Sequence, residues 1–141
     1  MNAPLYSLDV LRLAAASADT PRLDQANSSA ERRSAVCGSR ITVDVVTDTA
    51  GRVTQYGHEV RACALGQAAA TVLAQSIVGR GHCEVAAARG ALAAFLAGDC
   101  DNLPEWPAVE ILARARPYAA RHSAVLLPFD AAADALGAAT G

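Results

Sequence analysis

Two cysteines lie at the ends of a predicted β-hairpin. Cys37 belongs to the motif Cys37-Gly38-Ser39, just before a strand, and Gly38 lets the backbone adopt unusual angles and come close to a ligand. Cys63 lies between the second strand and a helix, where the free N–H groups and the dipole of a helix N-terminus favour a thiolate. If the two strands pair, both thiols come to the same end of the hairpin. Soft metals and iron–sulfur clusters bind to such thiol pairs.

The alternative interpretation of this pair is structural, because a single cysteine in an alanine-rich chain is most often a small buried apolar residue. Cys83 and Cys100 are interpreted in this way, since one begins a predicted helix and the other lies in a predicted loop. The sequence has no Cys-x-x-Cys pair, which excludes zinc-ribbon and thioredoxin-like motifs. His58 and Glu59 share a predicted strand without a serine or threonine nucleophile beside them, so we do not expect a hydrolase.

The elements that position the thiols follow from hydrophobic periodicity. Ile41, Val43 and Val45 alternate in a β-branched strand, which a turn at residues 48–52 joins to a second strand over residues 53–60. We expect a third strand at residues 34–37, a loop at residues 24–29, and helices over residues 5–18, 63–78, 83–97, 108–115 and 123–136. The last helix contains Pro128, which a helix tolerates in its first turn. Strands followed by helices indicate an α+β fold, with a small antiparallel three-stranded sheet and helices packed on one face. We expect a single domain spanning residues 1–141.

Composition narrows the classes of function. The chain has 141 residues, of which 52% are hydrophobic, enough for one core. No apolar run approaches the roughly 18–20 residues of a membrane span, and the N-terminus does not resemble a secretory signal. We therefore expect a cytoplasmic protein with reduced thiols and no membrane partner. The net charge of −2 argues against a nucleic-acid partner. All 12 basic residues are arginine, which excludes lysine chemistry such as Schiff bases.

Several short motifs follow one another along nearly the whole chain. They are a first helix containing Tyr6, Thr20-Pro21-Arg22, Cys37-Gly38-Ser39, a hairpin turn at Gly51, Ala62-Cys63-Ala64, Val78-Gly79-Arg80, and the segment Arg121-His122-Ser123-Ala124-Val125-Leu126-Leu127-Pro128-Phe129. In this order they resemble the iron–sulfur cluster assembly scaffolds of the IscU, SufU and NifU N-terminal type, whose motifs include C-G-D, G-C-A and, in SufU, R-x-K-C-A-x-L-x-W. The resemblance implies a SufE/NifU-like fold that builds a [2Fe–2S] cluster or binds zinc at its cysteines.

This chain departs from the family pattern at two ligand positions. Ser39 replaces the aspartate of C-G-D and is a poorer metal ligand, and the third cysteine falls at Ala124, or at Ser123 if the segment is shifted by one. The L-P-P-V-K peptide that an assembly chaperone recognises in IscU is absent. His122 lies beside the vacant position, where IscU proteins have a histidine, so the resemblance makes its imidazole a candidate metal ligand. The alternative for His122 is a surface histidine near the start of a helix.

The sequence therefore predicts an iron–sulfur cluster assembly protein that is not an enzyme. We expect it to act like a scaffold and to bind iron, a [2Fe–2S] cluster or zinc through Cys37 and Cys63, with His122 as a further metal ligand. A cysteine desulfurase and other cluster-assembly proteins are the expected partners, and a monomer or weak homodimer is the expected state. Two alternatives stay open: an acceptor of persulfide sulfur from a cysteine desulfurase, as in SufE proteins of the same fold, or an interaction module that has lost its metal site.

Overall fold

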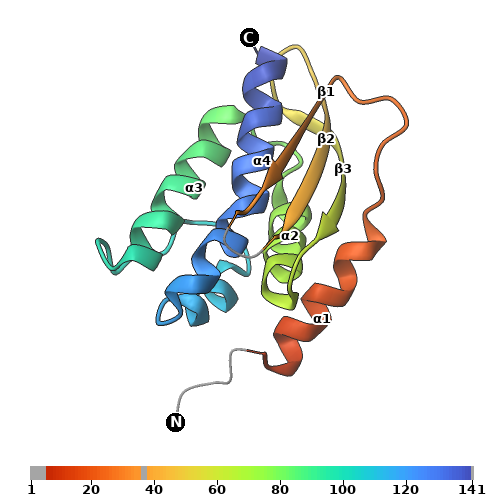
Figure 1. Ribbon diagram of the computed structural model, residues 1–141. Helices are drawn as coiled ribbons and strands as arrows, with labels where there is room; N and C mark the ends of the chain where they lie inside the picture. Colours follow the sequence, from red (N-terminus) through yellow and green to blue (C-terminus); the bar gives the residue numbers. More distant parts are fainter. Residues whose placement is uncertain (1–5, 36–37, 141) are drawn as a thin grey trace.

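The computed structural model describes residues 6–35 and 38–140 and confirms the α+β architecture (Figure 1). With η denoting a 3₁₀ helix, the elements are, in chain order, α1 (Leu8–Ala16), η1 (Ser17–Asp19), β1 (Ser28–Arg33), β2 (Arg40–Thr47), β3 (Val53–Arg61), α2 (Ala64–Ser76), α3 (His82–Ala97), η2 (Val109–Ala115), η3 (Ala119–Arg121) and α4 (His122–Thr140). No helix in the described part of the chain is long and apolar enough to span a membrane.

The three strands form one antiparallel sheet with β2 at its centre (Figure 1). Ile41, Val43 and Val45 on β2 are buried on the same face of the sheet, as their alternation in the sequence predicts. Helix α4 packs against β1 and β2, and α2 packs beside α4. Helix α1 in turn contacts α2, and α3 contacts α4. The predicted sheet with helices packed on one face is therefore confirmed.

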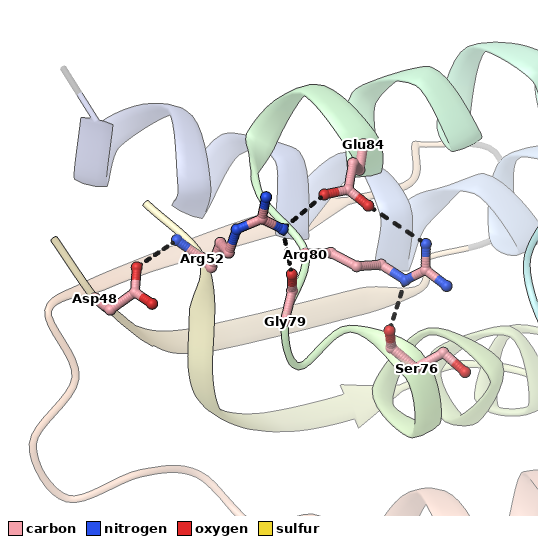
Figure 2. Close-up of polar contacts among 6 residues, drawn as sticks. All are labelled: Asp48, Arg52, Ser76, Gly79, Arg80 and Glu84. Carbon is pink, nitrogen blue, oxygen red and sulfur yellow. Dashed lines mark hydrogen bonds and ion pairs between the residues drawn. The ribbon is translucent and has the colours of Figure 1, made fainter. Parts of the chain in front are cut away.

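Charged side chains tie the turn between β2 and β3 to the start of α3 (Figure 2). The Asp48 carboxylate accepts a hydrogen bond from the N–H of Arg52 across the turn (3.0 Å). The Arg52 guanidinium donates to the carbonyl oxygen of Gly79 (2.9 Å) and pairs with Glu84 (3.5 Å). Glu84 also pairs with Arg80 (3.6 Å). These contacts fix the end of the hairpin that lies away from Cys63.

The segment between η1 and β1 runs across the outer face of the sheet. Arg22 donates two hydrogen bonds to the buried Asp44 carboxylate (2.9 and 3.0 Å), which also accepts one from the Ser29 hydroxyl (2.5 Å). Gly57 on β3 makes this close approach possible, because a Cβ at residue 57 would lie only 2.4 Å from the carbonyl oxygen of Pro21. The outer face thus gains one buried, fully hydrogen-bonded carboxylate.

The expected position of the third strand is wrong. The strand is β1, at Ser28–Arg33, and it begins inside the stretch expected to be a loop. Of the expected strand at residues 34–37, Ser34 and Ala35 lie in the turn after β1, and the other two residues lie outside the described part of the chain. As an edge strand, β1 is largely exposed and has no alternating apolar face. Its position therefore depends on its pairing with β2.

Three details of the helices also differ from expectation. The first helix begins at Leu8, so Tyr6 precedes it, and the expected helix over residues 108–115 is the 3₁₀ helix η2. Pro128 is the seventh residue of α4 and lies in its second turn, not in its first. Proline has no N–H, so the carbonyl oxygen of Ala124 receives no helical hydrogen bond from residue 128.

Candidate functional site

The register of the hairpin places the residues that neighbour the two predicted thiol ligands in the sequence at the same end of the sheet. Arg40, the first residue of β2, lies directly opposite Arg61, the last residue of β3. The two ends of the hairpin therefore meet, as the sequence predicts for a paired hairpin. Cys63 follows shortly after Arg61, whereas Cys37 lies outside the described residues. The candidate site is the region where this end of the sheet meets the first turns of α2 and α4.

The β1–β2 connection, to which Cys37 belongs in the sequence, is closed by backbone hydrogen bonds. The N–H of Ser34 donates to the carbonyl oxygen of Ser39 (2.8 Å), and the N–H of Gly38 donates to that of Ser34 (2.9 Å). Gly38 has φ +70°, a left-handed conformation that glycine adopts without strain. Ser39, which stands where the family has aspartate, is buried. Gly38 of the Cys-Gly motif therefore allows the backbone to make this turn without strain.

Cys63 is the N-cap residue of α2. Its backbone is extended (φ −63°, ψ 167°), and its carbonyl oxygen accepts the N–H of Gln67 (2.9 Å). Its thiol is free, and the residue is partly exposed. The unpaired N–H groups at the start of a helix stabilise negative charge. Cys63 therefore combines solvent access with a position that suits a sulfur ligand or nucleophile.

The position of the missing third cysteine lies against the first turn of α2. Ala124 on α4 is only 1% exposed, and a Cβ on Gly66 would lie 3.6 Å from the Ala124 Cβ and 3.4 Å from its carbonyl oxygen. Gly66 is in the first turn of α2, just after the N-cap Cys63. The first turns of α2 and α4 therefore meet next to this cysteine, but residue 124 supplies a methyl group in place of sulfur.

A pair of serine hydroxyls joins the β1–β2 connection to α4. The Oγ atoms of Ser34 and Ser123 are 3.0 Å apart, and Ser34 is buried. The sequence singled out Ser123 only as the alternative position of the third cysteine, and it gave no signal for Ser34. Their contact spans most of the chain, so only the packing of α4 against the sheet reveals it.

His122, the first residue of α4, hydrogen-bonds through its ring. Its Nε2 lies 3.0 Å from the carbonyl oxygens of both Ala115 and Arg116. A carbonyl oxygen can only accept, so Nε2 carries a proton and is the donor. A metal would therefore bind this ring through Nδ1. Within residues 6–35 and 38–140, no three His, Cys, Asp or Glu side chains gather into a metal site, so His122 stays a predicted ligand.

Arginines dominate the charge at this end of the sheet. Arg33, Arg40 and Arg61 lie opposite one another across the three strands. Glu31 pairs with Arg33 (3.0 Å), and this hydrogen bond lowers the pKa of the Glu31 carboxyl. Glu59 pairs with Arg61 (3.5 Å) and lies 4.0 Å from Arg40. This row was not predictable from the sequence, because strand register alone brings its members together.

His58, which the sequence did not place in a catalytic triad, has a structural role. Its Nε2 lies 2.8 Å from the carbonyl oxygen of Ser17, to which it donates, and its Nδ1 accepts from the hydroxyl of Tyr56 (2.9 Å). His58 is only 3% exposed, and burial lowers the pKa of its imidazole. The ring is therefore neutral and serves to join η1 to β3.

The solved structures that are similar to this chain include two iron–sulfur cluster assembly relatives that match most of its length. The crystal structure of the N-terminal part of a nitrogen-fixing NifU-like protein from Brucella abortus has 34% identity, covers 96% of this chain and 94% of its own, and gives a TM-score of 0.89. A putative iron–sulfur cluster assembly scaffold protein for the SUF system from Fervidobacterium islandicum has 19% identity, covers 94% of this chain and 96% of its own, and gives a TM-score of 0.82. Neither protein-family models nor curated proteins match the sequence.

Proposed function

Since the chain belongs to the NifU-like N-terminal family of iron–sulfur cluster assembly scaffolds, we propose that it acts like a scaffold in cluster assembly. It binds iron, a [2Fe–2S] cluster or zinc through Cys37 and Cys63, and His122 is a further metal ligand. The observation that carries the proposal is the pairing of Arg40 with Arg61, because it closes the hairpin end that both cysteines flank in the sequence.

The donor set suits a soft metal without completing its coordination. Two thiolates and one imidazole make three ligands, whereas structural zinc sites and [2Fe–2S] clusters take four protein ligands. Ser39 and Ala124 stand where the family has further ligands. The fourth ligand comes from a second copy, in a weak homodimer, or from an outside thiol bound to a monomer. A site with fewer ligands of its own holds its cargo less tightly, which suits a protein that passes the cargo on.

In this role the protein is not an enzyme. It holds sulfur from a cysteine desulfurase together with iron, and it delivers both to other cluster-assembly proteins. Its residues 1–141 act as a single domain in the cytoplasm, without a nucleic-acid or membrane partner. The negative net charge of −2 supports the absence of a nucleic-acid partner.

A second candidate function is the acceptance of persulfide sulfur. The free, partly exposed thiol of Cys63 at the start of α2 favours it, because such a transfer needs only one accessible thiolate. In this step the Cys63 thiolate attacks the terminal sulfur of the desulfurase persulfide, and a new S–S bond forms at Cys63. The original S–S bond breaks, and the desulfurase cysteine leaves as a thiolate.

Two measurements on the same proteins separate these functions. Wild type, Cys63→Ala and the control Cys83→Ala are purified without oxygen and analysed for iron, zinc and acid-labile sulfide. Each is then incubated with a cysteine desulfurase and cysteine, and its mass is measured. A scaffold carries metal that only Cys63→Ala loses. A sulfur acceptor carries none but gains the mass of one sulfur atom unless Cys63 is replaced. If the wild type carried no metal and gained no sulfur, both functions would be wrong. The interaction module would then be the remaining interpretation.

A further inference from the structure

Arg33, Arg40 and Arg61 form a row across the end of the sheet. Arg33 pairs with Arg40, and Arg40 pairs with Arg61, so every strand contributes one arginine at the same level. Residues directly opposite one another project from the same face of a sheet, and neighbouring strands lie about 4.8 Å apart. The row is therefore about 10 Å long. The side chains of Arg33 and Arg61 are both 69% exposed, and that of Arg40 is 32% exposed.

The acidic neighbours of this row do not balance its charge. Glu31 forms an ion pair with Arg33, while Glu59 is shared between Arg61 at 3.5 Å and Arg40 at 4.0 Å. Three guanidinium groups thus face two carboxylates, in a protein whose overall net charge is −2. Like charges placed directly opposite each other destabilise a pair of strands. The row therefore destabilises the pairing of the strands locally. It also leaves a positive surface that the neighbouring carboxylates do not neutralise.

Protection of the sheet edges does not account for the row. Charged side chains on edge strands prevent pairing with other chains, which explains Arg33 on β1 and Arg61 on β3. Arg40, however, lies on β2, which is paired on both sides and needs no such protection. The row adjoins the candidate site, since Arg61 ends the strand that leads into Cys63.

We propose that this arginine row docks an acidic surface patch of the protein that supplies sulfur to the neighbouring thiol. The proposal rests on the proposed function, in either of its two forms. Guanidinium groups bind carboxylates through paired hydrogen bonds, and complementary charge both steers and orients a partner. A nucleic acid fits less well, because stable binding neutralises many phosphates over a length greater than this row. The occupant is therefore a protein with at least two neighbouring carboxylates on its contact surface.

Strand β3 offers a matched pair of variants for the test. Arg61 is the last residue of β3, and Arg52 immediately precedes its first residue, Val53. Both side chains are exposed, at 69% and 58%, and each pairs with one glutamate at 3.5 Å. Arg61→Glu and Arg52→Glu thus change the net charge equally. The dissociation constant of each variant with the cysteine desulfurase of the same organism is measured by calorimetry, at low and at high salt. Circular dichroism checks that both fold.

We expect Arg61→Glu to weaken binding about tenfold at low salt, and Arg52→Glu to bind like the wild type. The difference between the variants should shrink at high salt, since salt screens exposed charges. Arg61→Lys, which keeps the charge but not the paired hydrogen bonds of a guanidinium, should bind with an affinity between those of the wild type and Arg61→Glu. If Arg61→Glu fails to fold, Arg61→Gln gives the same comparison with a smaller expected effect.

Equal binding by Arg61→Glu and Arg52→Glu would overturn the docking proposal, while sulfur transfer to the wild type would still support the proposed function. A wild type that neither binds the desulfurase nor accepts its sulfur would overturn the docking proposal together with its premise. A labelled single-stranded oligonucleotide and phosphatidylserine vesicles are tested in parallel. If Arg61→Glu abolished binding to either probe and left desulfurase binding intact, the row would belong to that anion and the proposal would be wrong.

Discussion

Ala124 of α4 packs against Gly66 of α2, where a Cβ at residue 66 would lie in van der Waals contact with the Ala124 Cβ, at 3.6 Å. The contact lies one helical turn from Cys63, the N-cap residue of α2. A thiol at residue 124 would therefore lie beside the first turn of α2, where a third thiolate is missing.

We expect Ala124→Cys to tighten zinc binding at least about tenfold, because a third thiolate replaces a methyl group at an incomplete site. Competition with a chromophoric chelator measures the affinity. Ala131→Cys, at another buried alanine of α4, adds a thiol away from the site and serves as the control. Equal effects of the two variants would mean that residue 124 does not face the metal, and Ser123→Cys then tests the shifted alignment.

His122 provides a test of the third ligand. We expect His122→Ala to bind zinc more weakly than the wild type at about pH 7.5, because the loss of one ligand from a three-ligand site leaves the ion poorly held. His82→Ala, at the start of α3, should match the wild type. Equal zinc affinities for all three proteins, measured by competition with a chelator, would show that His122 is not a ligand.

Two glycines should respond in opposite ways to the same substitution. A Cβ at Gly57 would lie 2.4 Å from the Pro21 carbonyl oxygen, so Gly57→Ala must displace the segment that carries Arg22. We expect it to lower the free energy of unfolding by about 1–3 kcal/mol. Gly90, within α3, has nothing within 4 Å of a Cβ, so Gly90→Ala should raise it by about 0.5–1 kcal/mol. Urea denaturation measures both, and a neutral Gly57→Ala would contradict the close approach.

The buried Asp44 carboxylate predicts how stability depends on pH. Burial acts to raise the pKa of Asp44, but hydrogen bonds from Arg22, Ser29 and the N–H of Leu23 outweigh it and hold the pKa below its ordinary value. A lowered folded-state pKa stabilises the protein above the unfolded-state value of about 3.9, and this contribution is lost as the pH falls through the folded-state pKa.

We therefore expect Asp44→Asn to cost about 1–3 kcal/mol of unfolding free energy at neutral pH, and less as the pH falls through the lowered folded-state pKa of Asp44. Denaturant titrations at several pH values measure the difference from the wild type. Asp24→Asn, at an exposed position of the same segment that covers the sheet, should have little effect at any pH. If the cost of Asp44→Asn did not depend on pH, the hydrogen-bonded carboxylate would not be the source of the stability.

The parts of the fold that bury a periodic apolar face were predictable from the sequence. The central strand was predictable from the alternation of Ile41, Val43 and Val45. Its pairing with β3 made it predictable that the two ends of the hairpin meet. Strand β1 was misplaced because it is a polar edge strand whose position depends on its pairing with β2. A helix tolerates proline in its first turn, but Pro128 is the seventh residue of α4 and lies in its second turn; the expected start at residue 123 would already have made it the sixth.

The candidate site was predictable only where it depends on local motifs. Cys63 was identified as the start of a helix, and the structure confirms that position. The contact of Ser34 with Ser123 and that of Gly66 with Ala124 depend on how α4 packs, which no local pattern reveals. The roles of the thiols and of His122 as ligands stay predictions, because they depend on a metal and partners that only experiment can supply.

Anaerobic reconstitution with ferrous iron and sulfide tests the central claim most directly. Wild type is compared with the double variant Cys37→Ala/Cys63→Ala and with the control Cys83→Ala/Cys100→Ala, which removes the same number of thiols elsewhere. Bound iron, acid-labile sulfide and visible absorption are measured after desalting. We expect the wild type and the control to take up iron and sulfide equally and the Cys37→Ala/Cys63→Ala protein to take up neither. Equal uptake by all three proteins would contradict a scaffold site at Cys37 and Cys63.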